Sequence, residues 1–164
     1  MSNASEIEWG IAQRLNNLPE LADIQRIYLG MPYNVPTQYW PYIMVVVDVE
    51  TTAEVYTGNR LLRVYSGAIV INLIHQDIPE TVAGKIVRVP SYGDMRDWVE
   101  AIKHDLQAAK TLPEATIENG FIRTVQIGEQ AIQYGLAAET DRPDAYINFA
   151  VIPFDVEVVE AQNG

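Results

Sequence analysis

Two long runs of β-prone residues dominate the hydrophobic pattern in the first half of the chain. They span residues 42–56 and 61–75 and are rich in Val, Ile, Leu and Tyr. Between them lie Gly58 and Asn59, a pair that favours a two-residue hairpin turn because both positions tolerate positive φ. The pattern therefore predicts one long antiparallel hairpin.

A turn at these two residues would fix the register of the hairpin. The cross-strand pairs it predicts are Thr57 with Arg60, Tyr56 with Leu61, Glu54 with Arg63, Thr52 with Tyr65, and Val47 with Val70. Each arm would be roughly 15 residues long, well beyond the usual length of five or six. A hairpin of that length is expected to overhang its own domain, so its outer end should contact a partner.

The distribution of side chains along the hairpin divides it into two parts. Successive side chains point to opposite faces of a strand, and near Tyr42 both faces are apolar, whereas beyond Asp48 one face is acidic and the other carries valines. This predicts that 42–47 and 70–75 belong to the core and that 48–69 forms an arm reaching a neighbouring subunit. The expected contact residues are Val47, Val49, Glu50, Glu54, Val55, Arg63 and Tyr65.

Two amphipathic helices are predicted, one before the hairpin and one after it. The first begins with a capping box at residues 5–8, ends near Asn17 and carries an apolar stripe at Ile7, Ile11, Leu15 and Leu18. The second begins with Ser91 or Asp94 as its cap and carries a stripe at Met95, Trp98, Ile102 and Leu106. Both stripes are expected to pack on the same sheet.

Further strands are predicted at 24–29, within 121–139 and at 146–160, while 77–90 reads as an irregular crossover with room for a short strand. Pro153 has no N–H group to donate, which indicates a bulge, an edge position or a change of partner there. The order of elements predicts an α+β fold: a mainly antiparallel sheet, two helices packed on one face, and one long protruding β-hairpin. We expect a single domain over residues 1–164.

Composition narrows the classes of function. The chain has 11 basic and 22 acidic side chains, a formal net charge of −11, which disfavours tight binding to nucleic acid because that affinity comes from Lys and Arg. It contains no cysteine, so disulfides and thiolate metal sites are excluded. The first residues lack the features of a signal peptide, and no apolar run approaches the length of a membrane span. We expect no membrane association.

The sequence offers little for catalysis. His75 and His104 stand in no metal-binding spacing, no serine lies in a G-x-S-x-G motif, and neither common phosphate-binding glycine motif occurs. Carboxylate pairs such as Asp48 with Glu50 and Asp141 with Asp144 exist, but such pairs recur by chance on an acidic surface. We therefore expect no enzyme activity, no cofactor and no metal.

The loop at 31–41 holds three prolines and three aromatic residues. Tyr39 and Trp40 are candidates for an exposed anchor that binds a partner, since aromatic residues are enriched at binding hot spots. The alternative is a lid that closes one end of the core.

Several of these features together resemble the tail terminator and tail-completion proteins of long-tailed bacteriophages, the family of lambda minor tail protein U. The resemblance covers most of the chain and rests on its layout: an amphipathic first helix, a proline-rich loop leading into a hydrophobic strand, a long hairpin, a capped second helix with an inward tryptophan, and a last strand. The residues that carry it are Pro41-Tyr42-Ile43, Trp98 and Phe154-Asp155-Val156.

This resemblance implies a virion structural protein that forms a hexameric ring at the head-proximal end of the tail. There the ring would end polymerisation of the major tail tube protein and join the tail to head-completion proteins of the neck. DNA would pass through an acidic pore without tight binding. The resemblance also implies assembly in the host cytoplasm.

Two alternatives stay open. One is a head-completion or connector protein elsewhere in the neck. The other, from a different class, is a small-ligand-binding or hydrolytic α+β protein whose pocket lies under the aromatic residues Tyr33, Tyr39, Trp40 and Tyr42, with His75 or carboxylates converging on it.

Overall fold

The computed structural model describes residues 2–75, 84–128, 131–139 and 142–161. In this part of the chain the elements are, in order, α1 (Asn3–Asn16), η1 (Pro19–Leu21), β1 (Arg26–Leu29), η2 (Thr37–Tyr39), β2 (Tyr42–Glu50), β3 (Glu54–Thr57), β4 (Arg60–Ile74), α2 (Pro90–Ala109), β5 (Gly120–Ile127), β6 (Gln133–Glu139) and β7 (Arg142–Ala161).

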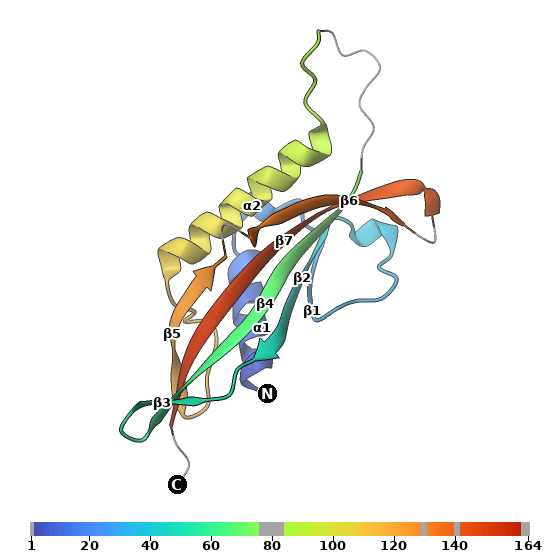
Figure 1. Cartoon of the computed structure of the whole chain (residues 1–164). Coiled ribbons are helices and arrows are strands. Elements are labelled where there is room, and N and C mark those ends of the chain that lie inside the picture. The colour runs from blue at the N-terminus through green and yellow to red at the C-terminus, as the bar shows by residue number, and fades with distance from the viewer. Residues whose placement is uncertain (1, 76–83, 129–130, 140–141, 162–164) are drawn as a thin grey trace.

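The strands form one sheet of seven strands, shown in Figure 1. Its main order is β1-β2-β4-β7-β5, with β3 also paired to β4 and β6 also paired to β7. The β1–β2 pair is parallel and the other pairs are antiparallel. The predicted α+β fold with a mainly antiparallel sheet is confirmed.

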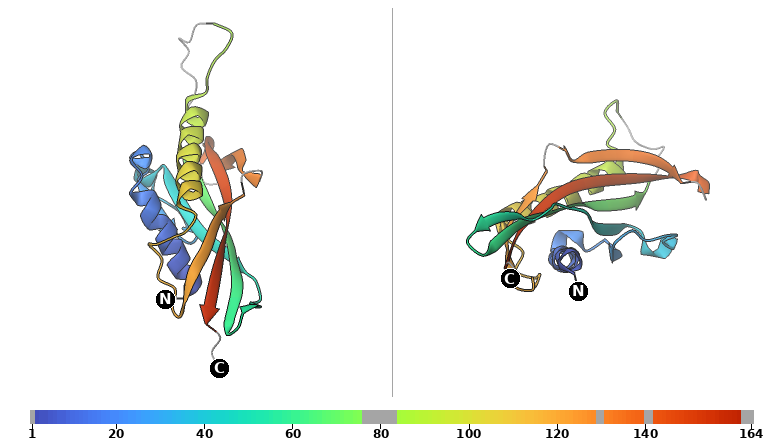
Figure 2. Two further views of the ribbon diagram at one scale, coloured as in Figure 1. Left: turned by 90° about the vertical axis from the view of Figure 1, so that its left-hand side faces the viewer. Right: turned by 60° about the horizontal axis from the view of Figure 1, so that its bottom comes forward.

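Both helices lie on the same side of this sheet (Figure 2). The predicted helical stripes point into the core, where Ile7, Ile11, Leu15, Ile102 and Leu106 are fully buried. They meet buried side chains from the three central strands: Ile43, Val45, Tyr65, Ile69, Ile71, Leu73, Ala150, Ile152, Phe154, Val156 and Val158. These side chains alternate along their strands, as expected for a sheet with helices on one face.

A charged contact joins the two helices at the edge of the core. The guanidinium of Arg14 donates from Nε and from a terminal nitrogen to the two carboxylate oxygens of Asp105, both at 2.9 Å, and from the other terminal nitrogen to Glu114 at 3.1 Å. Such forked contacts are among the stronger hydrogen bonds. The hydrogen bonds with Asp105 are the main cause of the raised pKa of Arg14.

The helix starts differ from the predicted caps. Ser2, rather than Ser5, caps α1 by accepting a hydrogen bond from the backbone N–H of Ser5. In α2 the cap position is Val89, without a side-chain hydrogen bond, so the prediction of Ser91 or Asp94 was wrong. Pro90 occupies the first turn, where its fixed φ suits a helix and its missing N–H costs nothing.

The hairpin turn is confirmed, but the predicted register is wrong beyond it. Thr57 pairs with Arg60 as expected, whereas Glu54 lies opposite Leu62 instead of Arg63, and Val47 lies opposite Gly67 instead of Val70. The register shifts between 55 and 57 and between 47 and 49, and residues 51–53 are not in a strand. At each irregularity one strand of the pair has extra residues that have no partner on the other strand.

Side-chain hydrogen bonds stabilise these irregular positions. The backbone N–H of Val47 donates to the carboxylate of Glu8 on α1 at 2.9 Å. The hydroxyl of Thr51 accepts from the backbone N–H of Val64 at 2.9 Å. Since a buried N–H must find a partner, these contacts replace the ladder bonds that a regular hairpin would make.

The hairpin does not stand alone outside the domain. β4 pairs with β7 over its whole length, from Arg60 with Ala161 to Ile74 with Ile147. Tyr65 is only 3% exposed and Ile69 is fully buried, so the core extends to residues 65–69 of the predicted arm, whereas the side chains of 48–63 are exposed or partly exposed. We predicted that the outer end of the hairpin would contact a partner. Much of that contact is made by β7 of the same chain.

Pro153 marks a change of partner on one side of β7, which was one of the three predicted options. On that side β6 pairs up to Val151, and β5 pairs from Phe154 onward. Half of the crossover predicted at 77–90, residues 77–83, lies outside the described residues, while 84–89 is irregular and Pro90 begins α2. No helix in the described part of the chain is long and apolar enough to cross a membrane.

Candidate subunit interface

The narrow end of the sheet carries most of the residues predicted for the contact arm. We call residues 49–63 the sheet tip; it includes β3 and the β3–β4 turn and lies at the lower left of Figure 1. Val49 is 52% exposed and Val55 is 75% exposed. Val49 pairs with Ser66 and Val55 with Leu61, so the two valines lie on opposite faces of the sheet as separate exposed apolar positions, and the side chains of Glu50 and Glu54 next to them in the chain are also exposed.

The remaining predicted arm residues belong to the fold itself. Arg63 does not face Glu54; its Nε lies 3.4 Å from a carboxylate oxygen of Glu160 near the end of β7. The same oxygen accepts hydrogen bonds from the hydroxyl of Tyr65 at 3.1 Å and from the side chain of Asn3 at 3.3 Å. These contacts tie β4, β7 and the start of α1 together below the tip.

Ionisation of the Tyr65 hydroxyl is expected to lower the free energy of unfolding at alkaline pH. Burial raises the pKa of this hydroxyl to about 12, and the nearby carboxylate of Glu160 adds to the rise. The ordinary value in an unfolded chain is about 10. Between these values the unfolded state loses the proton first, so the contribution of Tyr65 is complete below pH 10 and is lost as the pH rises toward 12.

We therefore expect the free energy of unfolding of Tyr65→Phe to fall less steeply than that of wild type above pH 10. Urea unfolding at pH 8, 10 and 11 measures both slopes. The matched control is Tyr33→Phe, which removes a hydroxyl from a side chain that is 90% exposed. Equal slopes for wild type and Tyr65→Phe would contradict the assignment.

The aromatic loop packs against the β1–β2 edge. The indole N–H of Trp40 donates to the carbonyl of Val35 at 3.0 Å, and its ring meets that of Tyr42 edge-on, with 4.7 Å between centroids. The guanidinium of Arg26 lies 4.1 Å from the centre of the Tyr39 ring. Tyr39 and Trp40 are thus engaged within the chain and half-buried, while Tyr33 is the exposed aromatic residue of this loop.

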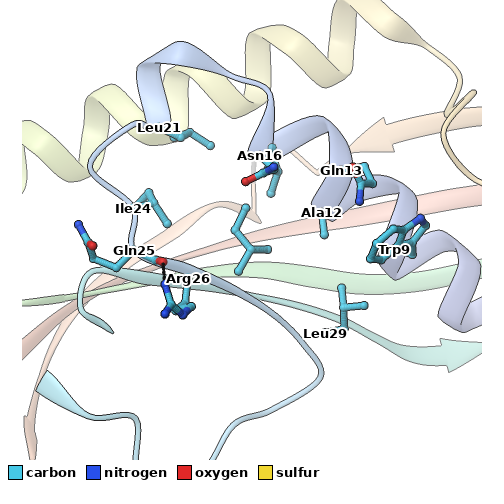
Figure 3. Close-up of a pocket in the computed structure, with 11 residues that line it drawn as sticks. Trp9, Ala12, Gln13, Asn16, Leu21, Ile24, Gln25, Arg26 and Leu29 are labelled. Carbon is cyan, nitrogen blue, oxygen red and sulfur yellow. Dashed lines mark hydrogen bonds between the residues drawn. The ribbon is translucent and has the colours of Figure 1, made fainter. Parts of the chain in front are cut away.

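A groove that the hydrophobic pattern did not reveal lies between α1 and β1, with a volume of about 430 Å³ (Figure 3). We call it the α1–β1 groove. Trp9 on α1 and Leu29 on β1 are its most exposed apolar side chains, at 43% and 45%, and both are drawn at one end of it in Figure 3. The groove is not lined by the aromatic residues around which the ligand-pocket alternative was built.

His75, which follows β4 directly, contacts a side chain of β7. Nδ1 of His75 lies 2.8 Å from the side-chain oxygen of Asn148, and no group of three or more His, Cys, Asp or Glu side chains in this part of the chain could hold a metal ion. The predicted carboxylate pair Asp141 with Asp144 falls outside the described side chains.

Comparison with known proteins leaves the family open. No family model and no curated protein matches the chain. Among the solved structures that match is a chain of the virion of a native gene transfer agent particle, with a TM-score of 0.49 and 13% sequence identity over 94% of this chain and 95% of that chain. At this level of similarity the match assigns neither family nor function.

Proposed function

We propose that this chain is a virion structural protein that forms a ring at the head-proximal end of a long phage tail. The ring ends tail-tube polymerisation and joins the tail to head-completion proteins. The observation that carries the proposal is the sheet tip, where Val49 and Val55 stand exposed at the end of a rigid sheet whose remaining arm residues are fixed within the fold. The layout of the sequence supports the same role.

The tip is the surface that meets the tail tube. Val55, at 75% exposed, supplies apolar area, and the exposed carboxylate of its chain neighbour Glu54 supplies a polar group beside it, a combination that suits a specific protein contact. A net charge of −11 fits a channel for DNA, because carboxylates repel the phosphate backbone.

Val55→Asp is expected to abolish capture of purified tail tubes while the chain stays folded. The substitution places a charge at the most exposed valine of the tip, but Val55 is already 75% exposed, so the free energy of unfolding should change by no more than about 0.5 kcal/mol. Sedimentation with tail tubes measures capture, and urea unfolding measures stability.

The matched control is Val87→Asp, because Val87 is also exposed but lies before α2, far from the tip along the chain. It should capture tubes as wild type does. If wild type binds isolated neck proteins but not tail tubes, the connector alternative replaces the terminator role. If Val55→Asp captures tubes normally, the tip is not the contact surface.

A further inference from the structure

Among the described residues β1, β3 and β6 each pair with a single neighbouring strand, and β3 lies at the sheet tip. β1 pairs only with β2 and β6 only with β7, and no other backbone hydrogen bond of the described residues reaches β6. By contrast β5, a further outer strand, receives a bond on its far side, because the N–H of Val125 donates to the carbonyl of Lys110 at 2.9 Å. Open edges readily pair with another strand.

The two open edges lie at opposite ends of the same rows across the sheet. One row runs from Arg26 on β1 through Tyr42, Asn72 and Phe149 to Gly135 on β6. β1 is parallel to β2, and three successive antiparallel pairings follow. β6 therefore runs opposite to β1, so β6 of one copy can extend β1 of another as an antiparallel neighbour.

Backbone groups of β1 point toward the open side. Gly30, just after the strand, donates its N–H inward to the carbonyl of Val45 at 3.0 Å. Because the direction alternates along a strand, Tyr28 also faces inward, and the N–H and C=O groups of Ile27 and Leu29 face outward. They are available to an added strand.

Apolar side chains at the two edges lie on the same face of the sheet. Tyr134 and Leu136 pair with Ala150 and Asn148, two buried residues of the face that the helices cover. Leu29 pairs with Val45 on that same face. Tyr134 is 37% exposed and Leu136 is 48% exposed. If the sheet continued from one copy to the next, these two side chains would lie against the α1–β1 groove.

Charge favours this contact between copies of an acidic chain. The groove is lined by no acidic residue, and its one charged lining residue is Arg26. Residues 133–138 of β6 carry no charged side chain. With 22 acidic residues in each copy, most other pairs of surfaces would bring carboxylates together, which costs affinity.

We propose that β6 of one copy adds to β1 of the next and seats Tyr134 and Leu136 in the α1–β1 groove. The two surfaces are different, so the contact is head-to-tail, and a head-to-tail contact that closes on itself makes a ring. This contact would join neighbouring subunits of the ring proposed above. It rests on the proposed function only in placing that ring in the tail.

The test uses one variant for each side of the contact. Leu136→Lys alters the strand edge and Leu29→Lys alters the groove; both side chains are nearly half exposed, so both variants should fold. Each alone is expected to weaken self-association by roughly tenfold or more, since a charge replaces a central apolar contact. Sedimentation velocity measures the assembly, and circular dichroism checks the fold.

Mixing the two variants gives the sharpest result. A Leu29→Lys chain labelled with ¹⁵N keeps an intact β6, and an unlabelled Leu136→Lys chain keeps an intact groove, so together they form a single good contact. Native mass spectrometry should show mixed dimers and no ring. Leu136→Ser and Leu29→Ser, which add no charge, should show the same pattern with a smaller shift. Val55→Lys, at the tip, should associate as wild type does.

The outcomes separate this contact from the proposed function. A wild-type chain that stays monomeric at high concentration, or a ring that ignores both edge variants, overturns the β6–β1 contact. If the ring ignores both edge variants but wild type still captures tail tubes, the terminator role stands. If wild type forms a ring that the edge variants lose, but wild type captures no tail tubes, the β6–β1 contact is supported and the tail role is overturned.

Discussion

Replacing Gly67 with alanine is expected to destabilise the fold by roughly 3 kcal/mol, the upper range for inserting a group into a packed site. Gly67 lies in the middle of β4, opposite Val47 on β2 and Phe154 on β7. A Cβ atom there would overlap the backbone carbonyl oxygen of Val46. Backbone held by strands on both sides cannot move away easily, so the β2–β4 ladder must distort. Urea unfolding at neutral pH measures the loss.

Gly93→Ala is the matched control for that substitution. Gly93 lies within α2, and an added Cβ would have only Cδ of the Arg88 side chain near it, at 3.8 Å, which is an ordinary contact. Alanine should stabilise the helix there by about 0.5–1 kcal/mol. If Gly67→Ala unfolds within about 0.5 kcal/mol of wild type, the close approach of β2 to β4 at this position is wrong.

Phe154→Ala is expected to cost about 3–5 kcal/mol, as for other large-to-small changes at aromatic core residues. Phe154 is 2% exposed and is among the largest fully buried side chains. It lies on β7 where β5 replaces β6 as the neighbour, so its removal leaves a cavity where four strands converge. The same unfolding experiment measures it.

Phe121→Ala provides the comparison for the second prediction. Phe121 is also in a strand paired with β7, but it is 47% exposed, so its loss should cost well under half as much. Similar losses at the two positions would contradict the burial assigned to Phe154. Since Phe154 and Gly67 are cross-strand neighbours, their effects should not be additive in the double variant.

The helices and the hairpin turn could be predicted because each rests on local chemistry. A stripe such as Ile7, Ile11 and Leu15 can be buried only on one face of a helix, and Gly58, at φ 53°, has the positive φ that the turn required. Which side chains share a face of each central strand was also predictable, since side chains alternate whatever their partner is. These features need only a few adjacent residues.

The register could not be predicted because distant groups determine it. The N–H of Val47 is satisfied by Glu8, 39 residues earlier, and the shift beside it moves every pair that follows. The arm was misread for a related reason. Nothing within 48–69 reveals that β7, some ninety residues later, runs along β4 and buries Tyr65.

One candidate contact surface could be predicted from the sequence, and the other could not. The sequence located Val49 and Val55, because valines beyond Asp48 alternate with acids and their exposure follows from the pattern. It did not locate the α1–β1 groove or the open edge of β6. Trp9 and Leu29 belong to different elements, and only their packing brings them together.

The sequence by itself determined both helices with their inward faces, the β-prone segments, the turn at Gly58 and the acidic net charge, because these depend on residue type and local spacing. Tertiary structure alone decided the strand order, the register and which edges stay open. Backbone hydrogen bonds have no sequence preference of their own, so pairing is chosen by how the whole set of side chains packs. In the described part of the chain that choice leaves β1, β3 and β6 each with a single strand neighbour.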